Sequence, residues 1–226
     1  MRSSAQSRLR DARQQMYQGL VLDAAEAIFA EHGYEAAKVQ SIAAAAGVSL
    51  ATLYAAFPTK WDVYRAVHAR RLDDMLAAIR ALDIGAEEPL DQMLAGIDAY
   101  VEFHMRHPDY LRMHLQEGHA WATGSSLRSP EQIAAWKEGL QRIAKAFEAG
   151  IRGGIFVDEE PPLLMARTMM AMHQVRLADW VASGMKERVA DVTAKIRRQF
   201  IRTFCRIEVV SERLGSGKRS ARRAAR

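Results

Sequence analysis

Apolar residues recur at every third or fourth position along most of the chain, and this spacing predicts a series of amphipathic helices. The first covers residues 13–31, presents a broad apolar face and is expected to end at Gly33. A long helix begins at a capping pattern formed by Thr59 and Asp62 and continues to about Leu82. Alternating β-branched runs between turn residues are missing, which predicts an all-α fold. Further helices are expected near residues 89–106, 109–118 and 130–150.

Two helices near the end of the chain carry more apolar surface than one small domain needs. Residues 162–183 are apolar on nearly every side, and residues 186–213 place apolar side chains opposite an arginine-rich side. We expect both helices to join a four-helix interface between two subunits, although they would also suit the core of a monomer. The expected dimer interface consists of Val189, Val192, Ile196, Phe200, Thr203 and Ile207.

Two short helices joined by a three-residue turn are expected between residues 39 and 57. Gly47 suits the left-handed position of the turn, and Ser49 can cap the second helix. This spacing is typical of a helix-turn-helix, although a generic helical hairpin shares it. The two helices are expected to share a small core of Ile42, Ala46, Val48, Leu53 and Phe57.

The particular residues in and around these helices resemble the N-terminal domain of the TetR family of bacterial transcription regulators. The resemblance implies a three-helix DNA-binding domain joined to a C-terminal helical domain that binds a ligand and dimerises. We therefore expect a homodimeric repressor that binds a near-palindromic operator in double-stranded DNA and is released by a small apolar or amphipathic effector. The resemblance covers about residues 16–65 and rests on Phe29–Tyr34, Ile42–Ala43, Ala46–Ser49, Thr52–Tyr54, Phe57–Pro58 and Lys60.

The same resemblance implies which residues contact DNA. A helix with the sequence LATLYAA offers methyl groups to thymine but few hydrogen bonds to other bases. We therefore expect this helix to make few sequence-specific base contacts. Ala37 stands where the family often has a capping Thr, so the first short helix is expected to lack that cap. Phosphate contacts are implied for Ser49, Thr52, Tyr54 and Lys60, and base contacts for Leu50, Ala51 and Ala55, with help from Lys38, Gln40 and Ser41.

The net charge of +5 is concentrated at the two ends of the chain. The tail, residues 215–226, holds five of the 32 basic residues and no acidic residue. The rest of the chain therefore holds 27 basic residues, the same number as the acidic residues. Residues 1–13 hold four arginines against one aspartate. We expect this basic arm to supply much of the DNA affinity, whereas the tail is expected to be disordered and either solubilising or polyanion-binding.

The expected organisation is a basic arm (1–13), a helix-turn-helix domain (14–60), a ligand-binding and dimerisation domain (61–214) and the tail. Methionine, aromatic and histidine side chains in the third segment suit an adaptable apolar pocket, although each is also a plausible core residue. The candidate pocket residues are His68, Met75, Phe103, Met113, His114, Trp121, Trp136, Met169 and His173.

Other classes of protein are disfavoured by the sequence. No serine elbow, zinc-protease pair or dinucleotide fingerprint is present, so we expect neither an enzyme nor a cofactor. Cys205 is the single cysteine, and no metal site is expected. No apolar stretch has the length of a membrane span or a signal peptide, so we expect a cytoplasmic protein. The alternative is a helical scaffold that binds proteins or lipids without sequence-specific DNA binding.

Overall fold

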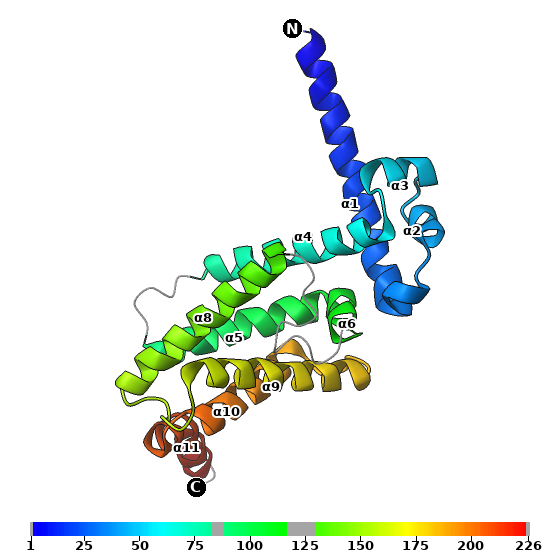
Figure 1. Ribbon diagram of the computed structural model, residues 1–226. Helices are drawn as coiled ribbons and strands as arrows, with labels where there is room; N and C mark the ends of the chain where they lie inside the picture. Colours follow the sequence, from blue (N-terminus) through cyan, green and yellow to red (C-terminus); the bar gives the residue numbers. More distant parts are fainter. Residues whose placement is uncertain (1, 83–87, 117–129, 225–226) are drawn as a thin grey trace. The chain divides into compact units, whose positions relative to one another are not determined.

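The computed structural model describes residues 2–82, 88–116 and 130–224, and the described residues confirm the all-α fold. They form two compact units. The first unit holds the helix-turn-helix, all of α6 and most of α4. The second unit holds α5, the helices after α6 and the last residues of α4. The helices are α1 (Arg2–Ala36), α2 (Val39–Ala45), α3 (Leu50–Ala56), α4 (Lys60–Arg80), α5 (Pro89–Arg106), α6 (Pro108–Gln116), α8 (Pro130–Arg152), α9 (Pro162–Ala182), α10 (Val189–Phe204) and α11 (Ile207–Ala224) (Figure 1).

The helix-turn-helix forms through local backbone chemistry that the sequence predicts. Gly47 adopts a φ of 66°, a left-handed conformation that disfavours any side chain. The Ser49 side chain accepts a hydrogen bond from the Thr52 backbone N–H at 3.0 Å, so it caps α3. The predicted shared core is confirmed, because Ile42 and Leu53 are fully buried and Ala46 and Phe57 are nearly so. Val48 packs against this core while remaining partly exposed.

Helix α1 is longer than the sequence predicts at its N-terminal end. Its helical conformation begins at Arg2, so the residues predicted as a basic arm continue α1. Figure 1 shows this extension reaching past α3 toward the start of the chain. Near the other end, Gly33 has a φ of 75° and interrupts the helix where the sequence predicts that it ends. The predicted arm is therefore a helical continuation of α1.

A capping box begins α4, and ion pairs hold α4 against α1. The Thr59 backbone N–H donates to the Asp62 carboxylate at 3.0 Å, and the Asp62 N–H donates to the Thr59 hydroxyl at 3.1 Å, so the predicted capping box is confirmed. Further along α4, Arg71 forms a two-point ion pair with Glu26 of α1, at 2.8 and 3.1 Å. Arg70 also contacts Glu26, at 3.2 Å. Because Glu26 is only 5% exposed, these two arginines balance a buried charge.

Helix α6 belongs to the first unit although it lies far along the sequence from the helix-turn-helix. The Gln116 side chain donates a hydrogen bond to the Ala30 carbonyl of α1 at 2.8 Å. Met113 is 1% exposed and joins the same hydrophobic core as Ile42 and Leu53. The DNA-binding unit therefore extends beyond residues 14–60, the boundaries expected from the sequence.

The second unit has an aromatic core between α8, α10 and the segment that follows α8. The rings of Phe147 and Phe156 lie 5.1 Å apart, and those of Phe200 and Phe204 lie 5.2 Å apart. Gly150 permits this packing, because a Cβ at that position would lie 2.2 Å from the Phe156 ring. The absence of a side chain at Gly150 thus lets the segment after α8 fold back onto the helix.

A β-bridge divides the C-terminal helix predicted for residues 186–213, so that prediction is wrong. Cys205 adopts an extended conformation and pairs with Phe156 in an antiparallel bridge. The Val157 N–H donates to the Phe204 carbonyl and the Arg206 N–H to the Ile155 carbonyl, each at 2.9 Å. These bonds satisfy backbone groups that a continuous helix would have paired internally. The second helix, α11, then continues to Ala224 and includes most of the tail expected to be disordered.

Three of the six residues predicted for the dimer interface are buried inside this unit. Val192, Ile196 and Phe200 are each at most 4% exposed and pack within the unit's own core. They are buried there because α10 packs against both α5 and α9. Of the other three, Val189 is half-buried, Thr203 is exposed, and Ile207 is 70% exposed at the start of α11. The apolar stripe of α10 serves the monomer, as the alternative interpretation allowed.

None of the described helices alone is long and apolar enough to cross a bilayer. The pair α2 and α3 reaches that apolar length only when joined, and the two helices are bent by 104°.

Candidate nucleic-acid interface

The outer side of α3 carries the residues predicted to face DNA. Leu50 and Tyr54 are 39% and 45% exposed, and Ala51 and Ala55 are exposed as well, whereas Leu53 points into the core. On α2 and just before it, Lys38, Gln40 and Ser41 are also exposed. With exposed Ser49 before α3, the structure thus leaves eight of the ten predicted DNA contacts exposed on or just before α2 and α3.

The remaining polar groups of α3 are held in position by each other. The Ser49 and Thr52 hydroxyl oxygens lie 2.8 Å apart and share a hydrogen bond. Ser49 is exposed, and Thr52 is half-buried at its side. Together with the cap on the Thr52 N–H, this bond fixes both side chains at the first turn of α3. The Tyr54 hydroxyl is therefore the longest-reaching polar group on the outer side of this helix.

Lys60 differs from its predicted role as a phosphate contact. Its ammonium group lies within hydrogen-bond distance of the Tyr34, Glu35 and Ala37 carbonyls, at 2.6, 3.1 and 3.2 Å. It also lies 4.5 Å from the centre of the Tyr34 ring. An ammonium group has three hydrogens, so all of them are used within the protein. Lys60 holds the end of α1 to the start of α4, and it satisfies carbonyl groups that the end of a helix leaves unpaired.

The start of α2 has no side-chain cap, as the sequence predicts. Lys38 stands at the N-cap position in an extended conformation, and its side chain makes no capping hydrogen bond. Ala37, where the family often has a capping residue, is 3% exposed and packs into the core. The Lys38 ammonium group is thus available to a partner outside the protein.

A small hollow lies between the N-terminal part of α1 and α3, and sequence reasoning did not identify it. Its volume is about 240 Å³, and it is lined by Arg13, Gln14 and Tyr17 from α1 and by Thr52, Ala55 and Ala56 from α3. The Arg13 guanidinium donates two hydrogen bonds to the Tyr17 hydroxyl, at 3.2 and 3.1 Å. The four-residue spacing of Arg13 and Tyr17 on one helix is the pattern from which this contact could have been predicted.

Comparison with known proteins identifies this arrangement. A model of bacterial regulatory proteins of the tetR family matches residues 21–67, which include α2, α3 and the capping box of α4. Over these residues the chain carries a tetR-family DNA-binding domain. Its DNA-binding helix-turn-helix is therefore part of a transcription regulator.

Two curated proteins and one solved structure are similar to this chain. An HTH-type transcriptional repressor of Streptomyces coelicolor is 26% identical over 67% of this chain and 73% of its own length. The HTH-type transcriptional activator FasR of Mycolicibacterium smegmatis is 33% identical over 38% of this chain and 39% of its own. The solved structure of a ketosteroid transcriptional regulator of Mycobacterium tuberculosis has a TM-score of 0.70 at 21% identity, and the match covers 84% and 95% of the two chains. The two curated relatives are thus a repressor and an activator.

The structure does not bring the predicted pocket residues together in one unit. His68, Met75, Met113 and His114 lie in the first unit, and Trp121 lies outside the described residues. His68 packs its ring 4.6 Å from Tyr64, so it belongs to the aromatic core of the DNA-binding unit. The prediction of a single pocket is corrected for these four, because α6 and the first part of α4 fold with the helix-turn-helix. Phe103, Trp136, Met169 and His173 lie in the second unit.

In the second unit, two histidines and a tyrosine lie together between α5 and α9. The Tyr100 ring lies 4.2 Å from His104 and 6.0 Å from His173. Nδ1 of His104 lies 2.9 Å from the Tyr100 carbonyl oxygen. His173 is 2% exposed, and its Nε2 has no hydrogen-bond partner in the part of the chain that the structure describes. Burial, and then the charge of nearby His104, lower the pKa of His173 to about 4, so its ring is neutral at pH 7.

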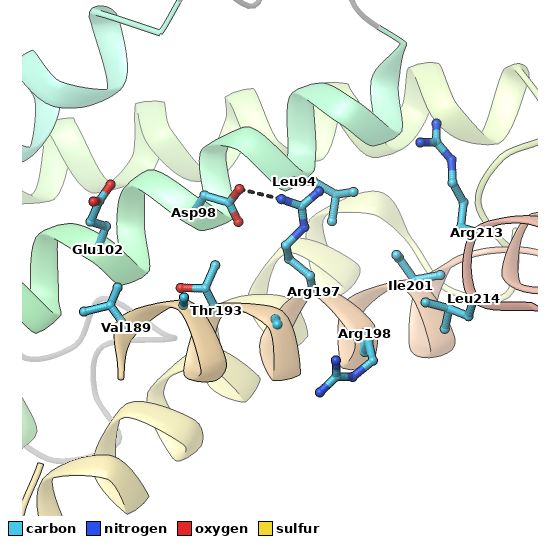
Figure 2. A pocket seen from close by; sticks show the side chains of 12 residues that line it. Leu94, Asp98, Glu102, Val189, Thr193, Arg197, Arg198, Ile201, Arg213 and Leu214 are labelled. Atoms are coloured by element: carbon cyan, nitrogen blue, oxygen red, sulfur yellow. Dashed lines mark hydrogen bonds and ion pairs between the residues drawn. The ribbon is translucent and has the colours of Figure 1, made fainter. Parts of the chain in front are cut away.

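The second unit also has a surface groove between α5, α10 and α11 (Figure 2). Its volume is about 760 Å³, and apolar Leu94, Ile201 and Leu214 line it beside charged groups. Figure 2 shows the Asp98 carboxylate facing Arg197, at a distance of 2.7 Å. Burial raises the pKa of Asp98, and the charge of Arg197 opposes this shift. None of the residues predicted for the ligand pocket lines this groove.

Proposed function

We propose that this regulator binds a near-palindromic DNA operator as a homodimer and that a small molecule releases it, as in a repressor. The observation that carries the proposal is the exposed side of α3, where Leu50, Ala51, Tyr54 and Ala55 face solvent beside a capped first turn. Two such helices would enter successive major grooves about 34–36 Å apart. The apolar methyl groups would contact thymine, and the exposed polar groups would contact the backbone.

We assign the phosphate contacts to polar side chains that are exposed to solvent. The Tyr54 hydroxyl extends from the exposed side of α3, and the Lys38 ammonium group lies before α2 on an exposed residue. Ser49 and Thr52, fixed by their mutual hydrogen bond, would present their hydroxyl groups at the first turn of α3. Lys60 acts indirectly, because it joins the end of α1 to the start of α4 and thereby supports α2. These contacts would position the protein without selecting the sequence.

The dimer contact is assigned to the exposed side of α9. Leu164 and Val175 are large apolar residues that are 44% and 69% exposed. Thr168 lies between them on the same side, together with the half-buried Ala171 and Ala178. Small residues at this spacing let two helices approach closely, and a matching helix from a second chain would cover Leu164 and Val175. The Arg176 side chain donates to Gln199 at 2.8 Å, which ties this helix to α10.

The effector contact is assigned to the polar cluster of Tyr100, His104 and His173. A buried nitrogen without a partner costs free energy, and a ligand hydroxyl or carbonyl group that reached Nε2 of His173 would remove that cost. Buried Met169 neighbours it on α9 and suits an apolar ligand body. Such a ligand would release DNA only by its differential affinity for the free and DNA-bound conformations.

A gel-shift experiment tests the proposed function. The purified protein is mixed with DNA from around its own gene at increasing salt and then with candidate apolar and amphipathic ligands. We expect a shifted band that weakens steeply with salt, because phosphate contacts release counterions. We also expect at least one ligand to reverse the shift. A protein that shifts no DNA even in dilute buffer would contradict the proposal and favour the helical scaffold.

A further inference from the structure

The recognition helix of this protein has few groups that can distinguish one base pair from another. Its exposed residues Leu50, Ala51 and Ala55 have no side-chain donors or acceptors. The Thr52 hydroxyl is engaged with Ser49. Sequence recognition in the major groove depends mainly on hydrogen bonds to base edges, and arginine and glutamine are among the side chains best suited to form them. A sequence-specific regulator with this α3 needs such groups from a neighbouring element.

Helix α1 places both of these residue types beside α3. Arg13 and Gln14 line the hollow of about 240 Å³ whose other side is formed by Thr52, Ala55 and Ala56 of α3. Arg13 and Gln14 are exposed, whereas Thr52 and Ala56 are half-buried. The hollow therefore adjoins the side of α3 that carries exposed Ala55. Because residues before Arg13 are helical as well, this part of α1 is a continuous helix.

Arg13 is held in one orientation by Tyr17. Its Nε and Nη2 atoms donate to the Tyr17 hydroxyl at 3.2 and 3.1 Å, and its guanidinium carbon lies 5.4 Å from the centre of the Tyr17 ring. A guanidinium group has five N–H donors, so these bonds leave the outer edge with Nη1 for a second acceptor. That edge can donate two parallel hydrogen bonds, as guanine O6 and N7 require. Holding the side chain in advance lowers the entropy lost on binding.

We propose that Arg13 and Gln14 of α1 read base edges next to α3, so that operator sequence is recognised jointly by the two helices. Arg13 donates to a guanine, Gln14 pairs with an adenine, and Tyr17 positions Arg13. This inference rests on the proposed function, because it requires that α3 lie in the major groove of an operator. It goes beyond that function by assigning base recognition to residues outside the helix-turn-helix.

The experiment selects binding sites for the full-length protein from random double-stranded DNA. Affinities are then measured for the selected site and for each of its single-base variants. Arg13→Lys keeps the positive charge but loses the two-point geometry, so discrimination at one guanine should fall about tenfold while binding to unrelated DNA and its salt dependence are unchanged. Gln14→Ala should lose a similar factor at a neighbouring adenine. Tyr17→Phe should give a smaller loss at the same guanine as Arg13→Lys.

Gln15→Ala is the matched control, because Gln15 is exposed on the same helix but does not line the hollow. It should leave base preference unchanged. If Arg13→Lys and Gln14→Ala also leave every base preference unchanged, or weaken all sequences equally, the inference is overturned and the proposed function stands. If the unmodified protein enriches no sequence at all, both fail. Circular dichroism of each variant establishes that the helical content is unchanged.

Discussion

At the scale of single residues, the clearest difference between sequence and structure concerns Lys60. Its position in the motif indicates a phosphate contact, yet its three hydrogens all point to backbone carbonyls near the end of α1. The motif identifies where a residue stands but not which acceptors surround it, because those acceptors come from residues 34–37, more than 20 positions earlier. The capping roles of Ser49 and Asp62 were predictable, since their partners lie three residues away.

Replacing Lys60 tests its structural role. Lys60→Met retains the aliphatic chain and removes three hydrogen bonds from a charged donor, so the free energy of unfolding should fall by about 2–3 kcal/mol. The measurement is equilibrium denaturation by urea. Lys38→Met serves as the control, because Lys38 is exposed and should change stability by less than about 0.5 kcal/mol. Unchanged stability in Lys60→Met combined with weaker DNA binding would instead support the phosphate contact.

His173 predicts a pH dependence of stability. Its pKa is about 4 in the folded protein against 6.5 for an unperturbed histidine, so between these pH values the unfolded chain binds a proton that the folded chain excludes. Stability from this residue is therefore lost as the pH falls from about 6.5 to 4, by roughly 3 kcal/mol in total. Urea denaturation at several pH values measures the loss. His173→Gln should reduce the pH dependence in this interval, and an identical slope in both proteins would argue against a neutral buried histidine.

At the scale of helices, the sequence predicts elements whose signals are local and misses those that depend on distant partners. The turn at Gly47 and the capping box before α4 are written in neighbouring residues, and both are confirmed. The break at Cys205 could not be predicted from neighbouring residues, because it depends on backbone hydrogen bonds to residues 155–157. The apolar stripe of α10 was likewise ambiguous, since periodicity reveals a buried face but not whether its own chain or a second chain covers it.

The segment after α8 packs back onto this helix at Gly150, and a substitution of Gly150 tests this packing. Gly150→Ala would place a methyl group 2.2 Å from the Phe156 ring, which must move away from a packed aromatic core. We expect the free energy of unfolding to fall by about 1–3 kcal/mol. Gly139→Ala is a matched control on the same helix with open space around it, and it should raise stability by about 0.5–1 kcal/mol. Thermal unfolding of both variants should show opposite shifts in Tm, and shifts of the same sign would contradict this packing.

At the scale of the whole molecule, the proposed assembly depends on which apolar side chains remain exposed. The DNA-binding unit was largely predictable from its motif, whereas the members of the effector pocket were not. Methionines and histidines at helical spacing are compatible with either unit, and the contacts of α6 decide that Met113 belongs with the helix-turn-helix. The dimer surface could be assigned only after burial of α10 had removed Val192, Ile196 and Phe200 from the candidates.

Two equally exposed apolar residues distinguish the possible dimer surfaces. Val175 on α9 and Ile207 on α11 are 69% and 70% exposed. Val175→Arg would bury an unpaired charge in the proposed α9 contact, so the dimer dissociation constant should rise about tenfold or more. Ile207→Arg should leave it unchanged. Sedimentation velocity over a range of protein concentrations gives both constants, and the reverse result would assign the contact to α11.

The central claim is that two copies of α3 lie in successive major grooves of one DNA site. Hydroxyl-radical footprinting on a selected site, with the stoichiometry of the complex measured in parallel, tests it most directly. We predict two protected segments related by a two-fold axis, with centres one helical turn or about 34–36 Å apart, and two chains for each duplex. A single protected segment occupied by one chain, or protection that does not depend on DNA sequence, would contradict the account.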